Sequence, residues 1–448
     1  MDFNAFKEAV MARAQELGIT EYELYYQASE STSVSAFQHE LNQFTSATDG
    51  GVCFRCIVNG KMGYVSTEEL SETQAAAIVT RAADNAAVLE AEEQVFLGQG
   101  GQTYADMELK PYELPGTDAL IAKVLETQEQ LYAADPAVVD GCETRGIVER
   151  MELAICNSKG LDLHYENNLA GLIVAAMVSD GKEMADDYQI KLGKLDTLDT
   201  VDLTKKAAEG ALRKLGGEVA PTGSYPVVFD PDAMSSLLAT FSGIFSSESA
   251  QKGLSKMAGK EGEAVAASCV TLVDDPFHPE SPMPIHFDAE GSPTRKKHVI
   301  ENGVLNTLLY NLKTAKKSGT ATTGNASKAG YASSVGIRPF TMYLAPGDLT
   351  EEELLAKAGN GVYITDLSGL HAGANAISGD FSLQSAGFMI RDGKKCEYVK
   401  SFTVAGNFYD LLKNITALAN NCHLPNAMGS TAFGAPSVLV DGLSIAGK

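Results

Sequence analysis

The sequence lacks any apolar run long enough to cross a membrane, which takes about 18 consecutive residues. Its longest candidate, Leu169 to Val178, has the length of a buried strand. We also expect no export signal, because the first residues predict an amphipathic helix interrupted by charged side chains. These are Asp2, Lys7, Glu8, Arg13 and Glu16. We therefore expect a cytoplasmic protein that does not span a membrane.

The sequence is also poor in positive charge. Its 35 lysines and arginines are outnumbered by 58 aspartates and glutamates, so the formal net charge is -23. Such a field repels phosphate backbones, and no stretch has the density of lysine and arginine that nucleic-acid binding requires. We interpret the short basic patch from Arg295 to Lys297 as a solvated turn. We therefore expect no direct contact with nucleic acid.

Cysteine is scattered and gives no metal or disulfide pattern. The seven cysteines are odd in number, which suits reduced thiols better than a disulfide framework. Cys53 and Cys56 have the spacing of half a zinc site, but the residues around them predict a strand. Residues three apart on a strand point to opposite faces, so the two thiols cannot bind one ion. We interpret this pair as structural.

The first half of the chain predicts the same order of elements twice. The first pass is a helix, three strands and a helix, at residues 3–17, 22–28, 52–58, 61–65 and 66–89. Asn59-Gly60 is a hairpin signal, and Ser66 with Glu69 predicts a capping box that opens the second helix. After a looser segment, a second pass follows at residues 120–131, 147–156, 161–165, 169–179 and 203–215. This order suggests an internal repeat.

The second half of the chain predicts mostly strands. The segment from Gly216 to Ser224 is rich in glycine, proline and threonine and marks the predicted boundary. After it, Asp230 and Pro231 suit the cap and first residue of a helix. Three further hairpin turns are predicted at Asn302-Gly303, Asp392-Gly393 and Asp441-Gly442.

These patterns predict an α+β protein of two domains. Residues 1–218 form an N-terminal helix and strand domain, and residues 225–448 form a β-rich domain with a mostly antiparallel sheet or barrel.

Histidines and carboxylates gather in one segment, which includes His278, His286 and Asp288. A metal site or an independent hydrolase site is one interpretation, but the spacing matches no pair of ligands on a helix. A polar loop over a sheet is the interpretation that we prefer. His371 lies between glycines that allow close approach of a backbone or ligand, although a loop histidine with satisfied hydrogen bonds explains it as well.

Several stretches together resemble one known family. They are Glu23-Leu-Tyr25, the glycine-rich hairpin from Asp49 to Tyr64, Thr323-Gly-Asn325, Gly369-Leu-His-Ala-Gly-Ala-Asn375, Ser378-Gly-Asp-Phe381, and Phe402-Thr-Val-Ala-Gly-Asn407 with Leu411 to Ile415. Their order along nearly the whole chain resembles the TldD/PmbA family. The resemblance implies a relation to a heteromeric zinc peptidase with two kinds of subunit.

The resemblance also implies which kind of subunit this chain is. The TldD branch carries a His-Glu-x-x-x-His helix and a C-terminal cysteine as metal ligands. Here Ala239, Thr240 and Ile244 stand at the helix positions, and none can ligate zinc or act as a general base. The stretch from Gly429 to Gly434 lacks the cysteine. The chain therefore resembles the PmbA branch, also called TldE.

The resemblance implies a non-catalytic subunit without metal or cofactor, in a complex that acts in proteolysis and peptide maturation. We expect zinc in a TldD-type partner, a homodimer as the alternative when the chain is isolated, and a peptide as substrate. The older family name, modulator of DNA gyrase, would then describe an indirect effect. The residues that we expect near the peptide are Asn325, His371, Gly373, Gly379, Asp380 and Asn407.

Two alternatives stay open at this point. The chain could be a self-sufficient hydrolase that uses His278, His286 and Asp288. It could also be a peptide-binding module that acts without a partner.

Overall fold

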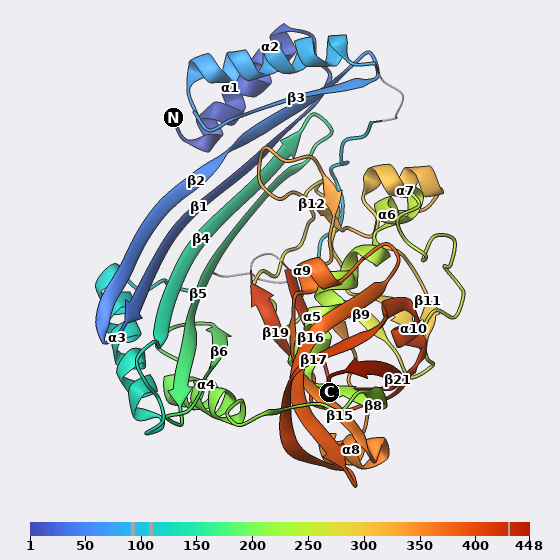
Figure 1. The fold of residues 1–448 in the computed structure, drawn as a ribbon. Helices are drawn as coiled ribbons and strands as arrows, with labels where there is room; N and C mark the ends of the chain where they lie inside the picture. The colour runs from blue at the N-terminus through green and yellow to red at the C-terminus, as the bar shows by residue number, and fades with distance from the viewer. Residues whose placement is uncertain (91–94, 107–110, 429–430) are drawn as a thin grey trace.

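The computed structural model describes residues 1–90, 95–106, 111–428 and 431–448, and it contains two units that lie side by side (Figure 1). The N-terminal unit is built on a six-stranded antiparallel sheet with the strand order β3-β2-β1-β4-β5-β6. Its elements are α1 (Phe3–Glu16), β1 (Glu21–Phe37), β2 (Glu40–Val58), β3 (Lys61–Thr67), α2 (Glu72–Val88), α3 (Thr117–Ala133), β4 (Glu143–Asn157), β5 (Asp162–Ser179), β6 (Met184–Leu192) and α4 (Thr200–Arg213).

Two helix pairs cover the two ends of this long sheet. α1 and α2 pack on one end through a core that includes Phe6 and Phe54. α3 and α4 pack on the other end through Leu120 and Leu172. The order of helix, three strands and helix therefore occurs twice, and β1 and β4 join the two copies at the middle of the sheet.

The C-terminal unit combines a closed barrel with a second sheet. Strands β8, β15, β16, β17 and β21 close into a five-stranded barrel, because β21 pairs with both β8 and β17. The second sheet has the order β11-β10-β9-β14-β20-β19, and β12 pairs with β13. The predicted α+β class with a β-rich, barrel-containing C-terminal half is confirmed.

The elements of the C-terminal unit have the following bounds: β7 (Glu218–Val219), β8 (Gly223–Phe229), α5 (Pro231–Phe241), η1 (Ser242–Phe245), α6 (Ser247–Gln251), β9 (Leu272–Asp274), β10 (Lys297–Glu301), β11 (Val304–Leu305), α7 (Leu312–Ser318), β12 (Ala326–Ser327), β13 (Gly336–Ile337), β14 (Thr341–Leu344), α8 (Glu351–Ala358), β15 (Gly361–Ser368), α9 (Leu370–Gly373), β16 (Asp380–Arg391), β17 (Lys394–Asn407), α10 (Phe408–Lys413), β18 (Ile415–Leu418), β19 (His423–Met428), β20 (Thr431–Ala435) and β21 (Val438–Ala446). β7 pairs with β17, so the pairing of the barrel sheet begins at Glu218.

Three of the four predicted hairpin turns are confirmed. Asn59, Asn302 and Asp392 have positive φ angles of 52°, 50° and 47°, and each is followed by a glycine that also has positive φ. Two consecutive residues in this region form the tight turn whose twist matches paired strands. The prediction at Asp441-Gly442 is wrong, because both residues lie inside β21 where its pairing with β8 is interrupted by a bulge.

The predicted capping box of Ser66 and Glu69 is also wrong. Ser66 belongs to β3, and α2 begins at Glu72 with Ser71 as its N-cap, whose side chain accepts the N–H of Gln74. The two strands predicted at residues 161–165 and 169–179 form the single strand β5, and β6 was not predicted at all. The cap at Asp230, with Pro231 as first helical residue, is confirmed.

The two units contact each other at both ends of the N-terminal sheet. Near one end, Met283, Ile285 and Phe287 pack on the sheet in a cluster with residues such as Tyr25 and Ile155. The preferred interpretation of this segment, a polar loop over a sheet, therefore needs one correction, since apolar side chains make the contact.

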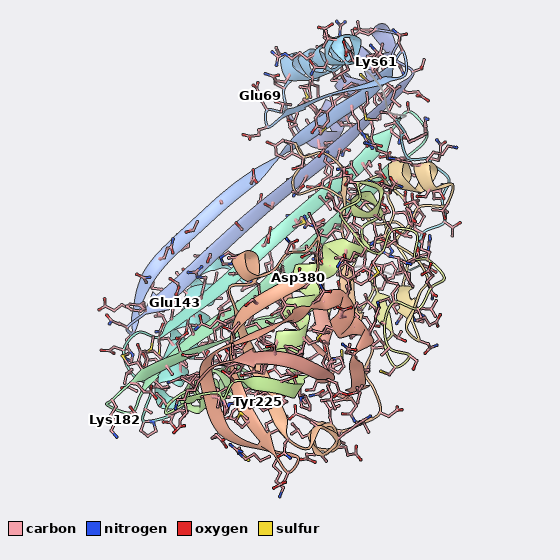
Figure 2. The ribbon with its side chains drawn as sticks, turned by 45° about the vertical axis from the view of Figure 1, so that its right-hand side comes forward. Lys61, Glu69, Glu143, Lys182, Tyr225 and Asp380 are labelled. Carbon is pink, nitrogen blue, oxygen red and sulfur yellow. The ribbon has the colours of Figure 1, made fainter. Side chains whose placement is uncertain are left out.

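The second contact is made of ion pairs. Lys214, which follows α4, contacts Asp366 of β15 at 2.8 Å, and Lys400 of β17 contacts Glu183 at 2.8 Å. Lys182 marks this end of the sheet in Figure 2, and Lys61 marks the opposite end. Within the described ranges, no helix is long and apolar enough to cross a membrane.

Candidate functional site

Helix α5 carries Ala239 and Thr240, and η1 carries Ile244; these are the positions that the resemblance to the TldD branch singled out. The Asp230 side chain accepts the N–H of Ala233 at 2.7 Å and so caps the helix. Burial raises the pKa of the Asp230 carboxyl well above its usual value. Leu237, Leu238 and Phe241 are fully buried and anchor α5 in the core of the C-terminal unit. This anchoring fixes the direction in which the remaining face of the helix points.

Ala239, Thr240 and Ile244 have different surroundings, and none of the three side chains offers a ligand for a zinc ion. Ala239 lines a cavity on α5. The Thr240 hydroxyl donates to the carbonyl of Ser236 at 2.8 Å, and Ile244, in η1, is buried in the core. A methyl group, an engaged hydroxyl and an aliphatic side chain offer none of the nitrogen, sulfur or carboxylate ligands that zinc takes. Nor do three or more His, Cys, Asp or Glu side chains form a metal-binding group elsewhere in the part of the chain that the structure describes.

The cavity on α5 lies between the two units and has a volume of about 500 Å³. Its apolar wall consists of Ala239 with Ile190, Pro425 and Phe433. Ile190 belongs to β6 of the N-terminal unit, whereas the other three belong to the C-terminal unit. A volume of this size is in the range of small-ligand sites, which are mostly apolar with few polar groups.

The polar groups of the cavity come from Tyr188, Ser242, Arg338 and Thr431. The Ser242 hydroxyl donates to the carbonyl of Ala239 at 2.9 Å. The Thr431 hydroxyl donates to the carbonyl of Pro339 at 3.1 Å. Since each hydroxyl has one hydrogen, both oxygens keep only their acceptor capacity for a ligand. No sequence motif marks these residues, because β6, α5 and β20 are far apart along the chain.

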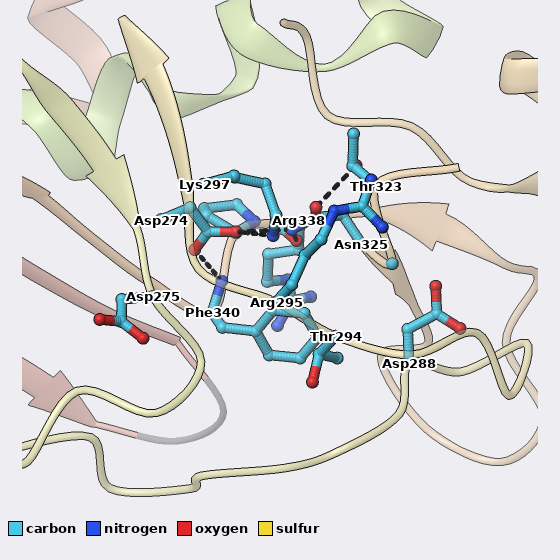
Figure 3. Close-up of polar contacts among 12 residues, drawn as sticks. Asp274, Asp275, Asp288, Thr294, Arg295, Lys297, Thr323, Asn325, Arg338 and Phe340 are labelled. Carbon is cyan, nitrogen blue, oxygen red and sulfur yellow. Dashed lines mark hydrogen bonds and ion pairs between the residues drawn. The ribbon is translucent and has the colours of Figure 1, made fainter. Parts of the chain in front are cut away.

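Asn325 lies in a buried polar network rather than on a surface (Figure 3). Its Nδ2 donates to Asp274 at 2.8 Å and to the carbonyl of Arg338 at 3.1 Å. Its Oδ1 accepts the Thr323 hydroxyl at 2.7 Å. Asp274 also accepts from Lys297 at 3.0 Å, which neutralises its buried charge. Asn325 therefore positions the segment that carries Arg338.

Gly379, Asp380 and Asn407 stabilise one loop. Asn407 donates to Asp380 at 2.7 Å and to the carbonyl of Ser378 at 2.9 Å, and it caps α10 by accepting the N–H of Tyr409. These bonds hold the pKa of Asp380 below its usual value, because Asn407 and Ser378 donate to the carboxylate. Gly379 has a φ of 86°, and a Cβ there would lie 2.4 Å from the Tyr409 ring.

His371 and Gly373 lie on the short helix α9, which contacts α5. His371 is exposed, and a Cβ on Gly373 would lie 2.4 Å from the carbonyl of Ser382. The six expected peptide-facing residues thus fall in three places: the Asn325 network, the Asn407 loop and α9. Of these six residues, His371 is exposed and lies outside the two hydrogen-bond networks described above. A ligand could therefore reach it without a rearrangement of either network.

His278, His286 and Asp288 do not combine into a hydrolytic site. Both carboxylate oxygens of Asp288 accept backbone N–H groups, at 2.9 Å, from Glu290, Ser292 and Ala326. The His286 ring packs near Phe277, and the His278 ring packs edge-on against Tyr343. The carboxylate thus holds a turn together instead of orienting an imidazole.

Cys53 and Cys56 lie on opposite faces of β2, as predicted. Cys53 packs in the cluster under Ile285 and Phe287, whereas Cys56 packs in the core under α1 and α2. Burial raises the pKa of both thiols, to about 11 for Cys56. Neither thiol is therefore a reactive group at neutral pH.

Sequence profiles of the PmbA/TldA metallopeptidase domains match most of the chain. Domain 1 matches residues 22–87, the central domain residues 110–215, and the C-terminal domain residues 222–447. The chain belongs to the TldD/PmbA family. A metalloprotease of Methanothermobacter thermautotrophicus is 28% identical over 88% of this chain and 87% of its own length.

Within the TldD/PmbA family the chain is of the PmbA, or TldE, type. The metalloprotease PmbA homolog of Haemophilus influenzae is 24% identical and aligns with 93% of this chain and 90% of its own length. A metalloprotease TldD homolog of Buchnera aphidicola aligns with only 58% of this chain and 56% of its own length, at 25% identity. The predicted branch is therefore confirmed.

Solved structures share the fold over nearly the whole chain. A Thermotoga maritima protein named as a modulator of a DNA gyrase superposes with a TM-score of 0.89 and 32% identity, covering 99% of this chain and all of the other. TldE from Thermococcus kodakarensis gives a TM-score of 0.87 at 24% identity, with coverage of 99% and 100%.

Proposed function

We propose that this chain is the non-catalytic subunit of a TldD/TldE-type zinc metallopeptidase, and that a TldD-type partner holds the zinc. The observation that carries the proposal is the state of the zinc-motif positions, where Ala239, Thr240 and Ile244 stand on an otherwise well-anchored α5 and η1. A catalytic zinc site needs three protein ligands and an open position. The family fold is thus retained while the residues for metal chemistry are replaced.

In this proposal the complex cleaves peptides, in proteolysis and peptide maturation, and this chain contributes binding surface. Support comes from the cavity that Ala239 lines, which is large enough for a peptide end and lies where the two units meet. The net charge of -23 supports a peptide rather than a nucleic acid as ligand. An effect on DNA gyrase would then be indirect.

The test measures zinc and peptidase activity in the same preparations. The full chain, a TldD-type protein from the same organism and the co-expressed pair are purified without histidine tags and assayed on an unstructured peptide. We expect peptidase activity only in the co-expressed pair, with about one zinc per partner chain and none in this chain. Hydrolysis by the isolated chain, together with stoichiometric zinc, would overturn the proposal. Full activity of the partner alone would also overturn it.

The two remaining alternatives predict different results in the same assay. A self-sufficient hydrolase would lose its activity on substitution of His286, whereas Asp288 is already engaged by backbone N–H groups. A peptide-binding module that acts alone would bind peptide and form no stable complex with the partner. Size-exclusion chromatography of the mixed proteins separates this last case from ours.

A further inference from the structure

The half of β2 that follows the β1–β2 turn has a partner strand on one side only. β1 pairs with β2 over residues 40–57, whereas β3 pairs only with residues 52–58. In the part of the chain that the structure describes, no other strand pairs with residues 43–49, so they form a free edge of the long sheet (Figure 1). We propose that this free edge pairs antiparallel with the same edge of a second copy of the chain, with Thr45 facing Thr45.

The free edge lacks the features that keep exposed strands apart. Such strands are commonly protected by lysine, proline, a bulge or short length. Residues 43–48 contain neither a charge nor a proline, in a chain with a net charge of -23. The bulge of the hairpin lies at Asn42, close to the turn, and the pairing is regular from Gln43 onwards. The edge is therefore a regular, uncharged template for another strand.

The turn that begins this edge is held in place by α3. His39 Nδ1 lies 2.8 Å from the Glu129 carboxylate, and the His39 ring stacks on Tyr132 with the ring centroids 4.0 Å apart. These contacts fix the hairpin before any partner binds. A pre-organised edge loses less conformational freedom on association than a mobile segment does.

An exposed aromatic ring favours a second copy over an arbitrary peptide. Phe44 is 55% exposed, although its partner on β1, Val34, is fully buried in the core under α3 and α4. In an antiparallel pair centred on Thr45, Phe44 faces Ser46 of the second copy. The two Phe44 rings are then diagonal neighbours, within reach of each other. A symmetric pair thus gives each exposed ring an apolar partner, which a peptide of arbitrary sequence does not supply.

The charges of the edge fit this register. Carboxylates that face each other across two strands are destabilising. Counted from Thr45, Glu40 faces Gly50 and Asp49 faces Leu41 of the second copy. A shift by one residue would place Glu40 opposite Asp49 and would bring two negative charges together. The register with Thr45 on the two-fold axis therefore brings two acidic molecules together at an uncharged contact.

The experiment measures the mass of the full-length chain by sedimentation velocity over a range of concentrations, without a TldD-type partner. We expect a dimer, with twice the mass of the 47.4 kDa chain. Thr45→Lys and Thr45→Glu should each weaken the dimer at least about tenfold, because like charges then face each other at the axis. An equimolar mixture of the two variants should dimerise again, since opposite charges meet. Thr20→Lys, at an exposed threonine just before β1, is the matched control and should dimerise like the native chain.

A cross-linking variant keeps the test independent of added charge. Thr45→Cys should form a disulfide between two copies in oxidising buffer, because facing residues of paired strands have Cα atoms within the range of a disulfide. Thr20→Cys should remain at the level of the native chain. That level accounts for the two exposed native cysteines, Cys269 and Cys396.

Four outcomes would overturn the proposal. They are a native chain that is monomeric at all concentrations, a dimer that Thr45→Lys leaves intact, a mixture of Thr45→Lys and Thr45→Glu that stays monomeric, and Thr45→Cys that cross-links no more than Thr20→Cys. Protection of residues 43–49 from hydrogen exchange only after an unstructured peptide is added would assign the edge to a peptide instead. Since no TldD-type partner and no catalysis enter these assays, the result does not depend on the proposed function.

Discussion

Lys296 and Lys297 show how strongly the contribution of an ion pair to folding stability depends on its surroundings. The Lys297 side chain is 7% exposed and contacts Asp274, which is fully buried, at 3.0 Å. The Lys296 side chain is 54% exposed and contacts Asp275 at 3.1 Å. Exposed pairs contribute little, because water and salt screen them, whereas removal of one partner from a buried pair leaves an uncompensated charge.

We predict that Lys297→Met lowers the free energy of unfolding by about 3 kcal/mol, because Asp274 loses its counter-ion inside the protein. Lys296→Met removes the ammonium group from the neighbouring position and should lower the free energy of unfolding by less than about 1 kcal/mol. Urea unfolding followed by far-UV circular dichroism gives both values. Equal costs for the two variants would show that Asn325 and the N–H of Phe340 stabilise Asp274 without the lysine.

The sequence allowed the motif residues to be selected but not their roles. Asn325 and Asn407 lie in stretches that resemble the family, yet each acts through partners that the chain brings from elsewhere. Asn325 bonds to a carboxylate 51 residues away, and Asn407 bonds to one 27 residues away. A single sequence contains no signal for such pairs. The cavity was missed for the same reason, because Tyr188, Ser242 and Arg338 share no local pattern.

At the scale of elements, α2 and β3 approach so closely that only glycine fits between them. A Cβ on Gly63 would lie 1.8 Å from the carbonyl oxygen of Ala82, which belongs to the backbone of α2. Both atoms belong to, or are attached to, backbone, so relief of the contact requires a shift of α2 against β3. α2 buries Ile78 and Val79 in the core of this end of the sheet, so such a shift would loosen that core.

We therefore predict that Gly63→Ala lowers the free energy of unfolding by about 2 kcal/mol or more, because the added methyl group displaces α2. Gly116→Ala is the control, since nothing lies within 4 Å of its Cβ position, and it should cost less than about 1 kcal/mol. Differential scanning calorimetry of both variants measures the difference. A stability of Gly63→Ala close to that of the control would contradict the close contact.

The predicted strands were too short where the sheet is not covered. Residues 40–49 of β2 are exposed, and β3 pairs only with residues 52–58, so this half of β2 forms a free edge. Without a buried face, no alternation of apolar and polar residues marks the strand. β6 was missed because its polar residues dominate its pattern. The hairpin turns, in contrast, were predictable because two adjacent residues determine them.

At the scale of the whole molecule, a buried group of charges lies between the two units. Arg55 of β2 contacts Glu23 of β1 at 2.7 Å, and Glu290 comes from the loop that packs on the same face of the sheet. Burial raises the pKa of Glu290 to about 7, with the nearby carboxylate of Asp288 as the second cause. Burial also raises the pKa of Asp288, to about 6, but its three accepted backbone N–H groups favour its charged form, so we assign the proton that is held to the higher pH to Glu290.

This assignment gives stability a definite dependence on pH. The folded protein holds a proton on Glu290 up to about pH 7, whereas an exposed glutamate releases it near pH 4.5. The folded state thus binds more protons between these values, and the stabilisation from this group is lost as the pH rises through 7. Glu290→Gln keeps an acceptor for the N–H of Leu312, which Glu290 Oε2 accepts at 2.8 Å, but cannot release a proton.

We predict that the free energy of unfolding of the native chain falls between pH 5 and pH 8 by on the order of 2 kcal/mol more than that of Glu290→Gln. Urea unfolding at pH 5, 6, 7 and 8 gives the two slopes. Glu397→Gln is the control, because the bond from Arg391 holds the pKa of Glu397 below its usual value and the group stays ionised throughout. Its slope should equal that of the native chain. If the pH dependence of stability of Glu290→Gln equals that of the native chain and of Glu397→Gln, the proton is not on Glu290. The contact between the two units would then not depend on pH through this group of charges.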